Sequence, residues 1–253
     1  MTRRAAIVTG ANRGIGLAIA EALAASGFDI LAADLGPAPS EELQSGVERN
    51  NGRLAYRAFD LADLSTHAGV IDAAQKEFGG IDCLVNNAGM ASPVRGDLLE
   101  MKPENFDKVL DVNLRGTIFF SQAVARAMLA APAKHGRSII TVTSVSAEFA
   151  SPERPDYCIS KAGLSMWVKN LALRLAADGI AVFEVRPGII RTDMTAAATE
   201  KYDGLIAQGL VPSRRWGEAS DVGLAVATLA AGTLGFATGS VLNVDGALSV
   251  RRL

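Results

Sequence analysis

The chain has 253 residues, of which 49% are hydrophobic and 21% charged, so it can bury the core of one large α/β domain or two small ones. Its formal net charge is −2 and its basic residues form no cluster, which argues against nucleic acid or an anionic membrane surface as a partner. The sequence lacks a roughly 18-residue apolar run, a signal-peptide pattern, a disulfide framework and metal-ligand spacing, and it therefore indicates a cytoplasmic protein without a metal site.

The first half of the chain alternates apolar runs with helical segments. Four apolar runs, each followed by turn residues, are typical of strands buried in a parallel sheet; they cover residues 5–8, 30–33, 54–59 and 81–85. Helical patterns cover 17–26 and 63–78, and a third helix begins at Ser40, whose side chain suits an N-cap. Gly27 and Gly79 follow two of these helices, at the position where glycine commonly ends a helix.

The second half repeats this alternation with longer helices. Pro103 suits the first turn of a helix, and further helical patterns cover 113–129, 156–177 and 219–231. Apolar runs at 138–143, 181–185 and 241–244 predict three more strands. The segment 192–212 is polar and rich in alanine and shows no strong pattern.

Strands that alternate with helices predict an α/β fold with a parallel sheet covered on both faces. No linker-like stretch interrupts the pattern, so we predict a single doubly wound Rossmann-type domain over residues 1–253, with a seven-stranded parallel sheet and helices on both faces. In this order of strands the switch point falls between the first and fourth strands. Binding sites are expected there, at the carboxyl ends of the strands.

A glycine-rich loop joins the first predicted strand to the first helix. Its glycines, Gly10, Gly14 and Gly16, would let the backbone turn tightly and approach a pyrophosphate that rests on the helix N-terminus. The spacing is one residue longer at the first gap than the common dinucleotide fingerprint, and a glycine loop by itself can be a simple turn. Asp34 ends the next strand and could hold the ribose hydroxyls of an adenosine, although it could also be an ordinary turn aspartate.

A second motif places Tyr157 and Lys161 four residues apart, and therefore on one face of a helix. A tyrosine hydroxyl has a pKa near ~10, and a nearby ammonium group lowers that pKa toward neutrality. Ser144, thirteen residues upstream, could hold a carbonyl oxygen at the same point, with Ser146 as a weaker rival. Such a group could move a proton on and off an alcohol oxygen, but many surface helices contain the same tyrosine–lysine spacing.

Taken together, the motifs are far more specific than any one of them. They are the loop 9–16, the Asn86-Asn87-Ala88-Gly89 turn, Asn113, Ser144, Tyr157 with Lys161, and the segment 187–192. In this order and spacing the sequence resembles the short-chain dehydrogenase/reductase family over essentially the whole chain. In overall look it is most similar to the 3-oxoacyl-(acyl-carrier-protein) reductase-like members of that family.

The resemblance implies four catalytic residues. Ser144 would orient the substrate carbonyl, and Tyr157 would act as the acid or base. Lys161 would lower the pKa of Tyr157 and bind the nicotinamide ribose, and Asn113 would hold a water in the proton relay.

The resemblance also implies a cofactor site. Asp60 would approach the adenine, Asn87 the neighbouring ribose and Thr192 the nicotinamide carboxamide, and residues 192–212 would form a mobile substrate lid. The implied cofactor-binding residues are Gly10, Asn12, Arg13, Gly14, Ile15, Gly16, Asp34, Asp60, Leu61, Asn87, Ala88, Gly89, Tyr157, Lys161, Pro187, Gly188, Ile190 and Thr192. Ala247 stands where relatives often carry a second glycine, which puts local packing there in doubt.

These roles describe hydride transfer between a nicotinamide cofactor and a carbonyl or secondary alcohol. We expect a small carbonyl, alcohol or acyl thioester substrate, with an acyl-carrier protein as a possible partner. A sugar or polyol dehydrogenase of the same family is the alternative, because the fold hosts many substrates. A non-catalytic dinucleotide-binding sensor or scaffold would be expected to lose Tyr157, Lys161 or Ser144, and all three are present. The family resemblance further implies a homotetramer.

Two residues give opposed signals about the cofactor. Arg13 precedes Gly14, where relatives that use the phosphorylated cofactor often carry a basic residue. Asp34 would hydrogen-bond a bare 2′-hydroxyl but would face a 2′-phosphate as a like charge. An exposed arginine recovers only ~0–1 kcal/mol. We therefore predict that NAD(H) is preferred and that NADP(H) remains possible.

Overall fold

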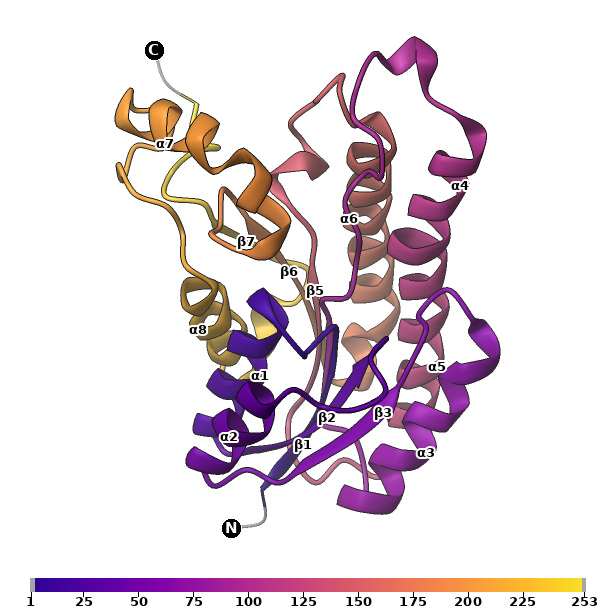
Figure 1. Cartoon of the computed structure of the whole chain (residues 1–253). Helices are drawn as coiled ribbons and strands as arrows, with labels where there is room; N and C mark the ends of the chain where they lie inside the picture. Colours follow the sequence, from indigo (N-terminus) through magenta and orange to yellow (C-terminus); the bar gives the residue numbers. More distant parts are fainter. Residues whose placement is uncertain (1–2, 252–253) are drawn as a thin grey trace.

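Seven strands lie in one parallel sheet at the centre of the computed structural model, which describes residues 3–251 (Figure 1). The strand order is β3-β2-β1-β4-β5-β6-β7, so the order reverses between β1 and β4 as predicted. The strands are β1 (Arg4–Thr9), β2 (Phe28–Asp34), β3 (Leu54–Ala58), β4 (Cys83–Asn86), β5 (Arg137–Val142), β6 (Ile180–Pro187) and β7 (Val241–Val244). The predicted Rossmann-type α/β fold is confirmed. That residues 1–253 form one domain stays a prediction, since four terminal residues lie outside the described part.

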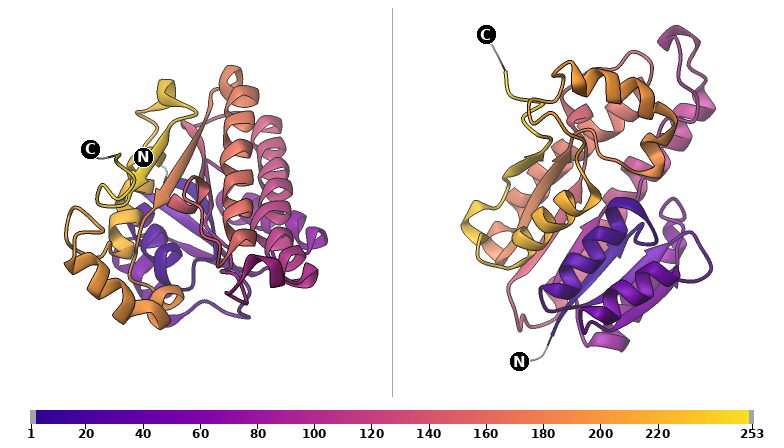
Figure 2. Two further views of the ribbon diagram at one scale, coloured as in Figure 1. Left: turned by 90° about the horizontal axis from the view of Figure 1, so that it is seen from above. Right: turned by 60° about the vertical axis from the view of Figure 1, so that its left-hand side comes forward.

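Helices cover both faces of the sheet, as the two further views show (Figure 2). Helices α1, α2 and α8 pack on one face, while α3, α5 and α6 pack on the opposite face. The helices are α1 (Gly14–Ala25), α2 (Glu41–Arg49), α3 (His67–Phe78), α4 (Pro103–Leu110), α5 (Thr117–Ala130), α6 (Pro155–Leu175), α7 (Thr199–Ala207) and α8 (Ala219–Ala230). Within residues 3–251 no helix is both long and apolar enough to span a membrane.

Alternation along the buried strands explains why the chain builds two hydrophobic cores. Ile7 and Val8 are adjacent in β1 and both are fully buried, but Ile7 belongs to the core beneath α3, α5 and α6, and Val8 to the core beneath α1 and α8. Successive side chains of a strand point to opposite faces, so a strand covered on both sides must be apolar throughout. Burial of each such side chain contributes about 1.5–3 kcal/mol.

The helix predicted over 113–129 begins differently from what the sequence indicated. Residues Asp111–Gly116 form a π-helical turn that joins α4 to α5. A Cβ added to Gly116 would lie 2.3 Å from the carbonyl oxygen of Leu61, so this turn packs directly against the loop after β3. Single π turns inside helices occur frequently at functional sites, and Asn113 lies in this one.

Segment 192–212 contains structure that the sequence did not indicate. It holds a 3-10 helix (Asp193–Ala198) and α7, and α7 buries only Ile206. Ile206 packs with Val211 and Trp216 in a small separate cluster. A helix with a single buried side chain shows no apolar stripe, which explains why the pattern was missed.

Ala247 adopts a left-handed backbone conformation with φ of +68°. The doubt raised at this position therefore concerns the backbone, because a Cβ in this conformation costs about 1–2 kcal/mol. The Asp245 side chain holds the turn by accepting hydrogen bonds from the amides of Ala247 and Ser249, each at 3.0 Å.

Ala247→Gly should raise the free energy of unfolding by up to about 1 kcal/mol, since glycine removes the strain but adds freedom to the unfolded chain. Ala225→Gly, inside α8, is the matched control and should lower it by about 1 kcal/mol. Urea unfolding of both variants measures the difference, and a loss of stability in Ala247→Gly would contradict the assigned strain.

Candidate active site

The loop between β1 and α1 is shaped by three glycines. Gly10 and Gly14 have φ of +68° and +55°, which side-chain-bearing residues rarely adopt. A Cβ on Gly16 would lie 1.9 Å from the carbonyl oxygen of Gly10, so only glycine lets the helix begin this close to the loop. Within the described residues no side chain caps the N-terminus of α1, and its first turn carries no acid. The free amides and the helix dipole therefore suit a phosphate group.

The turn after β4 is tied to this loop by hydrogen bonds. Thr9 Oγ1 accepts from the amides of Asn87 and Ala88, both at 3.0 Å. Asn87 Nδ2 donates to the carbonyl oxygens of Thr9 at 3.0 Å and of Gly10 at 3.1 Å. The switch point between β1 and β4 is thus one rigid unit, and Asn87 serves as a structural clamp in addition to any contact with a ribose.

Asp34 lies at the carboxyl end of β2, beside the glycine loop. Its Oδ2 accepts from the Asn12 amide at 2.9 Å and its Oδ1 from the Leu35 amide at 2.8 Å. The carboxylate is therefore held in place at the position where an adenosine ribose would lie. Arg13 points elsewhere: its guanidinium lies 3.8 Å from Asp193, and both side chains are about four-fifths exposed, at 82% and 79%.

The remaining predicted cofactor residues occupy the same edge of the sheet. Gly188 packs so closely on Asp245 that an added Cβ would lie 2.7 Å from the Asp245 Cβ. Thr192 lies beside the glycine loop, since a Cβ on Gly14 would approach its Cγ2 to 3.7 Å. Ile190 forms a parallel bridge with Gly217. The edge is completed by Ile15, Pro187, the buried Leu61 and the exposed Asp60.

The three residues expected to carry the chemistry come from two segments: Ser144 lies in the turn after β5, and Tyr157 and Lys161 lie on α6. Lys161 Nζ donates to the carbonyl oxygen of Val142 at 3.2 Å and lies 5.6 Å from the centroid of the Tyr157 ring. A Cβ on Gly89 would lie 3.7 Å from the same Nζ, which places the turn after β4 directly beside Lys161. Ser144 lies close enough to Tyr157 for its hydroxyl to lower the pKa of the tyrosine by hydrogen bonding.

Burial shifts the pKa values of both Tyr157 and Lys161. Burial raises the pKa of Tyr157 above its ordinary value, while the hydrogen bond from Ser144 and the charge of Arg154 lower it. Burial also lowers the pKa of Lys161 to about 8, against the opposing charge of Glu184. In the chain without its cofactor, desolvation of the phenolate outweighs the attraction by neighbouring charges, and that Lys161 lowers the pKa of Tyr157 stays a prediction.

The structure separates the two candidate serines. Ser144 Oγ accepts from the Ser146 amide at 3.1 Å and faces Tyr157. Ser146 Oγ instead accepts from the Arg154 guanidinium at 3.1 Å. The geometry therefore favours Ser144, and Ser146 holds an arginine.

The side chain of Asn113 is fully buried and occupied by the protein. Its Nδ2 donates to the Met90 carbonyl oxygen at 2.9 Å and to Ser160 Oγ at 3.1 Å, and its Oδ1 accepts from the Met90 amide at 2.8 Å. Both donors are used, so the amide ties the turn after β4 to α6. That Asn113 holds a water stays a prediction, and its Oδ1 has a second lone pair that can accept a hydrogen bond.

A buried polar network behind the site was missed at the sequence level. Glu184 in β6 is fully buried and accepts from Thr143 Oγ1 at 2.6 Å, Ser165 Oγ at 2.9 Å and Arg186 Nε at 2.6 Å. Arg186 also pairs with Glu148. The network joins the residue before Ser144 to the helix turn after Lys161. The sequence did contain a signal for this network, because an acid and a base two residues apart in an otherwise apolar strand lie on the same face of the sheet.

Glu184→Gln should move the alkaline limb of the pH profile to lower pH. The negative charge of Glu184 favours the ammonium form of Lys161. Removal of that charge also leaves the positive charge of Arg186 less compensated. Both effects lower the pKa of Lys161 below about 8. The profile of kcat/KM for the cofactor reports the free enzyme. Thr143→Val is the control, since it removes a hydrogen bond to Glu184 without a change in charge. A limb that stays in place in Glu184→Gln, or moves equally in Thr143→Val, would refute this electrostatic role.

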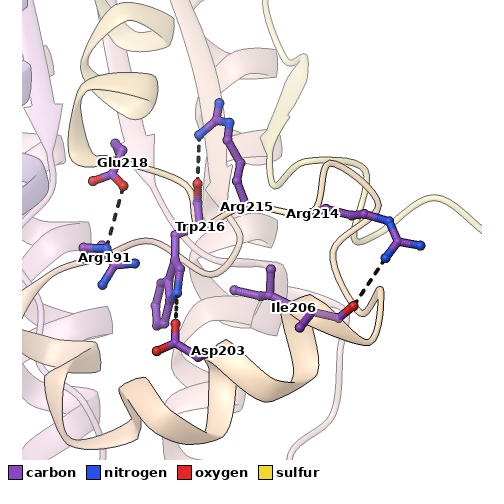
Figure 3. A pocket seen from close by; sticks show the side chains of 8 residues that line it. Arg191, Asp203, Ile206, Arg214, Arg215, Trp216 and Glu218 are labelled. Atoms are coloured by element: carbon purple, nitrogen blue, oxygen red, sulfur yellow. Dashed lines mark hydrogen bonds and ion pairs between the residues drawn. The ribbon is translucent and has the colours of Figure 1, made fainter.

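An open hollow of about 400 Å³ lies between α7 and residues 211–218 (Figure 3). That residues 192–212 form a substrate lid stays a prediction. Trp216 Nε1 donates to Asp203 at 2.6 Å, and the Arg191 guanidinium lies 4.7 Å from the Trp216 ring centroid. Tyr202 packs edge-on against Trp216, with ring centroids 5.8 Å apart. Arg191, Arg214 and Arg215 all line this hollow.

The fold and this geometry define a class of protein. A glycine loop whose uncapped helix N-terminus suits a phosphate lies beside a serine, a tyrosine and a lysine. The protein is a nicotinamide-dependent oxidoreductase that interconverts a carbonyl and an alcohol. Within residues 3–251, no group of three or more His, Cys, Asp or Glu side chains could hold a metal ion.

Comparisons with known proteins agree. Residues 10–249 match the family model described as enoyl-(acyl carrier protein) reductase. The 3-oxoacyl-[acyl-carrier-protein] reductase FabG of Escherichia coli (strain K12) is 38% identical over 245 residues, 96% of each chain. A crystal structure of a 3-oxoacyl-[acyl-carrier protein] reductase from Brucella melitensis in complex with NAD is 57% identical, with a TM-score of 0.97 over 100% of both chains. A candidate 2-deoxy-D-gluconate 3-dehydrogenase from Agrobacterium tumefaciens with bound NADP is 33% identical, with a TM-score of 0.87 over 98% and 97%.

The chain belongs to the short-chain dehydrogenase/reductase family. The family assignment made from its motifs is confirmed, and so is its reading as an oxidoreductase of the 3-oxoacyl-(acyl-carrier-protein) reductase-like group.

Proposed function

We propose that the protein reduces a 3-oxoacyl group, carried as a thioester, to the 3-hydroxyacyl group, with NAD(H) as the preferred cofactor. The observation that carries the proposal is the convergence of Ser144, Tyr157 and Lys161 beside the glycine loop. A similar protein from Brucella melitensis at 57% identity is described as such a reductase in complex with NAD. An acyl-carrier protein is the partner that this substrate implies.

The cofactor would lie along the carboxyl ends of β1, β2 and β4. Its pyrophosphate would rest on the uncapped N-terminus of α1, its adenosine ribose against Asp34, and its nicotinamide near Lys161 and Thr192. When bound, it supplies the hydride. The residues present suit such a group, because the N-terminus of α1 is uncapped and the Asp34 carboxylate is held beside it.

The protein's own residues then handle the proton and the substrate. Ser144 holds the carbonyl oxygen and Tyr157 donates its hydroxyl proton to that oxygen as the alcohol forms. The Lys161 ammonium, added to the charge of a bound oxidised nicotinamide, would bring the tyrosine pKa down from its raised value. The lid, residues 192–212, would cover the substrate, since its first residue already lies beside Gly14.

A sugar or polyol dehydrogenase is the second candidate, favoured by the similarity to the Agrobacterium tumefaciens protein. A panel of 3-oxoacyl thioesters, diketones and sugar alcohols, each assayed with both cofactors, discriminates between the two. Activity on sugar alcohols but on no thioester would replace the first proposal by the second. Reduction of an enoyl thioester at its double bond, as the description of the family model suggests, belongs in the same panel.

We also propose a homotetramer. Two separate surfaces expose large apolar side chains: Phe119, Leu129, Ile159, Met166 and Leu173 lie on α5 and α6, while Leu224, Phe236 and Leu242 surround β7. Two independent self-complementary contacts are what D2 symmetry requires. Light scattering should give about four times the 26.4 kDa monomer mass, and a monomer at micromolar concentration would exclude this assembly.

A further inference from the structure

Arg154 is a half-buried arginine next to the catalytic tyrosine, at the residue that precedes α6. Its guanidinium lies 5.1 Å from the centroid of the Tyr157 ring and, within residues 3–251, donates one hydrogen bond, to Ser146 Oγ at 3.1 Å. A guanidinium has five N–H donors in a fork that matches a carboxylate. Among the residues that the structure describes, no carboxylate forms an ion pair with Arg154.

Two carboxylates close to Arg154 in sequence are held by other partners, and the exposed Glu153 forms no ion pair with it in the part of the chain that the structure describes. Asp156 is buried and accepts hydrogen bonds from Ser92 Oγ and from the Tyr157 amide. Glu148 pairs with Arg186, behind the site. A partly desolvated cation without an acid is costly unless a ligand compensates it.

A second arginine faces the same region. Arg95 is exposed and lines an open hollow of about 620 Å³ together with Asp97 and Glu153. Asp97 accepts from the Leu99 amide at 3.0 Å and caps the short helix that follows. The positive charge of Arg95, like that of Arg154, lowers the pKa of the Tyr157 hydroxyl.

We propose that Arg154, assisted by Arg95, forms an anion subsite beside Tyr157, and that the protein also interconverts free 3-oxo carboxylates and 3-hydroxy carboxylates. The inference rests on the proposed carbonyl chemistry and extends it to a charged substrate class. In a 3-oxo acid the carboxylate is separated from the reacting carbonyl carbon by one methylene, which suits a guanidinium stacked over the tyrosine ring. The phosphate of a phosphopantetheine thioester lies at the far end of the pantetheine arm, too far from the reacting carbonyl to contact a guanidinium beside the tyrosine ring.

The reaction is balanced by the cofactor and one proton. The carbonyl carbon gains a hydride from the reduced nicotinamide, its C=O π bond breaks, and the oxygen takes the proton of the Tyr157 hydroxyl, which solvent then restores. The carboxylate keeps its charge throughout, so its contact with Arg154 persists from substrate to product.

Acetoacetate and methyl acetoacetate test the subsite, because they share the ketone and differ in charge. The wild type should favour acetoacetate in kcat/KM by about 10-fold to 100-fold, the worth of charge-assisted hydrogen bonds. Arg154→Gln retains a donor for Ser146 and should erase most of that preference through loss of acetoacetate turnover alone. Arg57→Gln, an exposed arginine on β3, is the matched control and should leave both substrates unchanged.

Several results would overturn the subsite. They are a wild type with no preference for acetoacetate, an equal loss for both substrates in Arg154→Gln, and an Arg154-dependent preference for acetoacetyl-CoA over the N-acetylcysteamine thioester, which would assign the arginine to the phosphate. If thioesters are reduced and acetoacetate is not, the subsite fails while the proposed function stands.

If none of these compounds is turned over, the proposed function fails, and calorimetry then tests the anion subsite by binding alone. Titration of 3-hydroxybutyrate into the NADH-loaded protein should then show binding to the wild type and none to Arg154→Gln. Equal binding, or none to either, would exclude the subsite.

Discussion

Tyr157→Phe should lower kcat by at least about 10²–10⁴-fold, the contribution typical of a general acid or base. The substitution keeps the ring that packs beside Lys161 and Arg154 but removes the transferable proton. Binding of the reduced cofactor, followed by its fluorescence, should survive, because the glycine loop and Asp34 are untouched.

Cys158→Ser is the neighbouring control. The thiol faces away from the site, toward the Phe149 carbonyl oxygen at 3.7 Å, so turnover should stay near the wild-type value. Near wild-type turnover in Tyr157→Phe would show that the proposed mechanism is wrong. Loss of cofactor binding in the same variant would show that the tyrosine acts through structure instead.

The second large effect concerns the choice of cofactor. The wild type should favour NADH over NADPH in kcat/KM by about 10²-fold, because a 2′-phosphate would meet the fixed Asp34 carboxylate as a like charge at a cost of several kcal/mol. Two backbone amides hold that carboxylate, so it cannot easily turn away. Asp34→Ser should bring the ratio toward unity.

Arg13→Gln tests the opposing signal. The Arg13 side chain is highly exposed and directed at Asp193, and exposed pairs contribute only ~0–1 kcal/mol. Its removal should therefore change the cofactor ratio less than about fivefold. A wild type that already favours NADPH, or a ratio that Asp34→Ser leaves unchanged, would contradict the assigned role of Asp34.

The sequence alone predicts those residues of the candidate site that lie directly at the ends of strands. Gly10, Asp34 and Asn87 come directly after apolar runs, and parallel strands bring their carboxyl ends to one edge. The tyrosine–lysine pair was equally accessible, because four residues in a helix always make one turn. Arg154 was not identified, although it lies three residues before Tyr157, since its lack of an acidic partner depends on where Asp156 and Glu148 point.

The sequence by itself determined the order of strands and helices, the glycine loop and the residues that meet at the switch point, because these follow from local periodicity and from a topology with few alternatives. Only the tertiary structure decided the π turn at Asn113, the direction of Arg13, and the buried network of Glu184 and Arg186. It also decided the raised pKa of Tyr157. Each of these depends on contacts between segments far apart in the chain, where burial and competing partners set the energy of a charge.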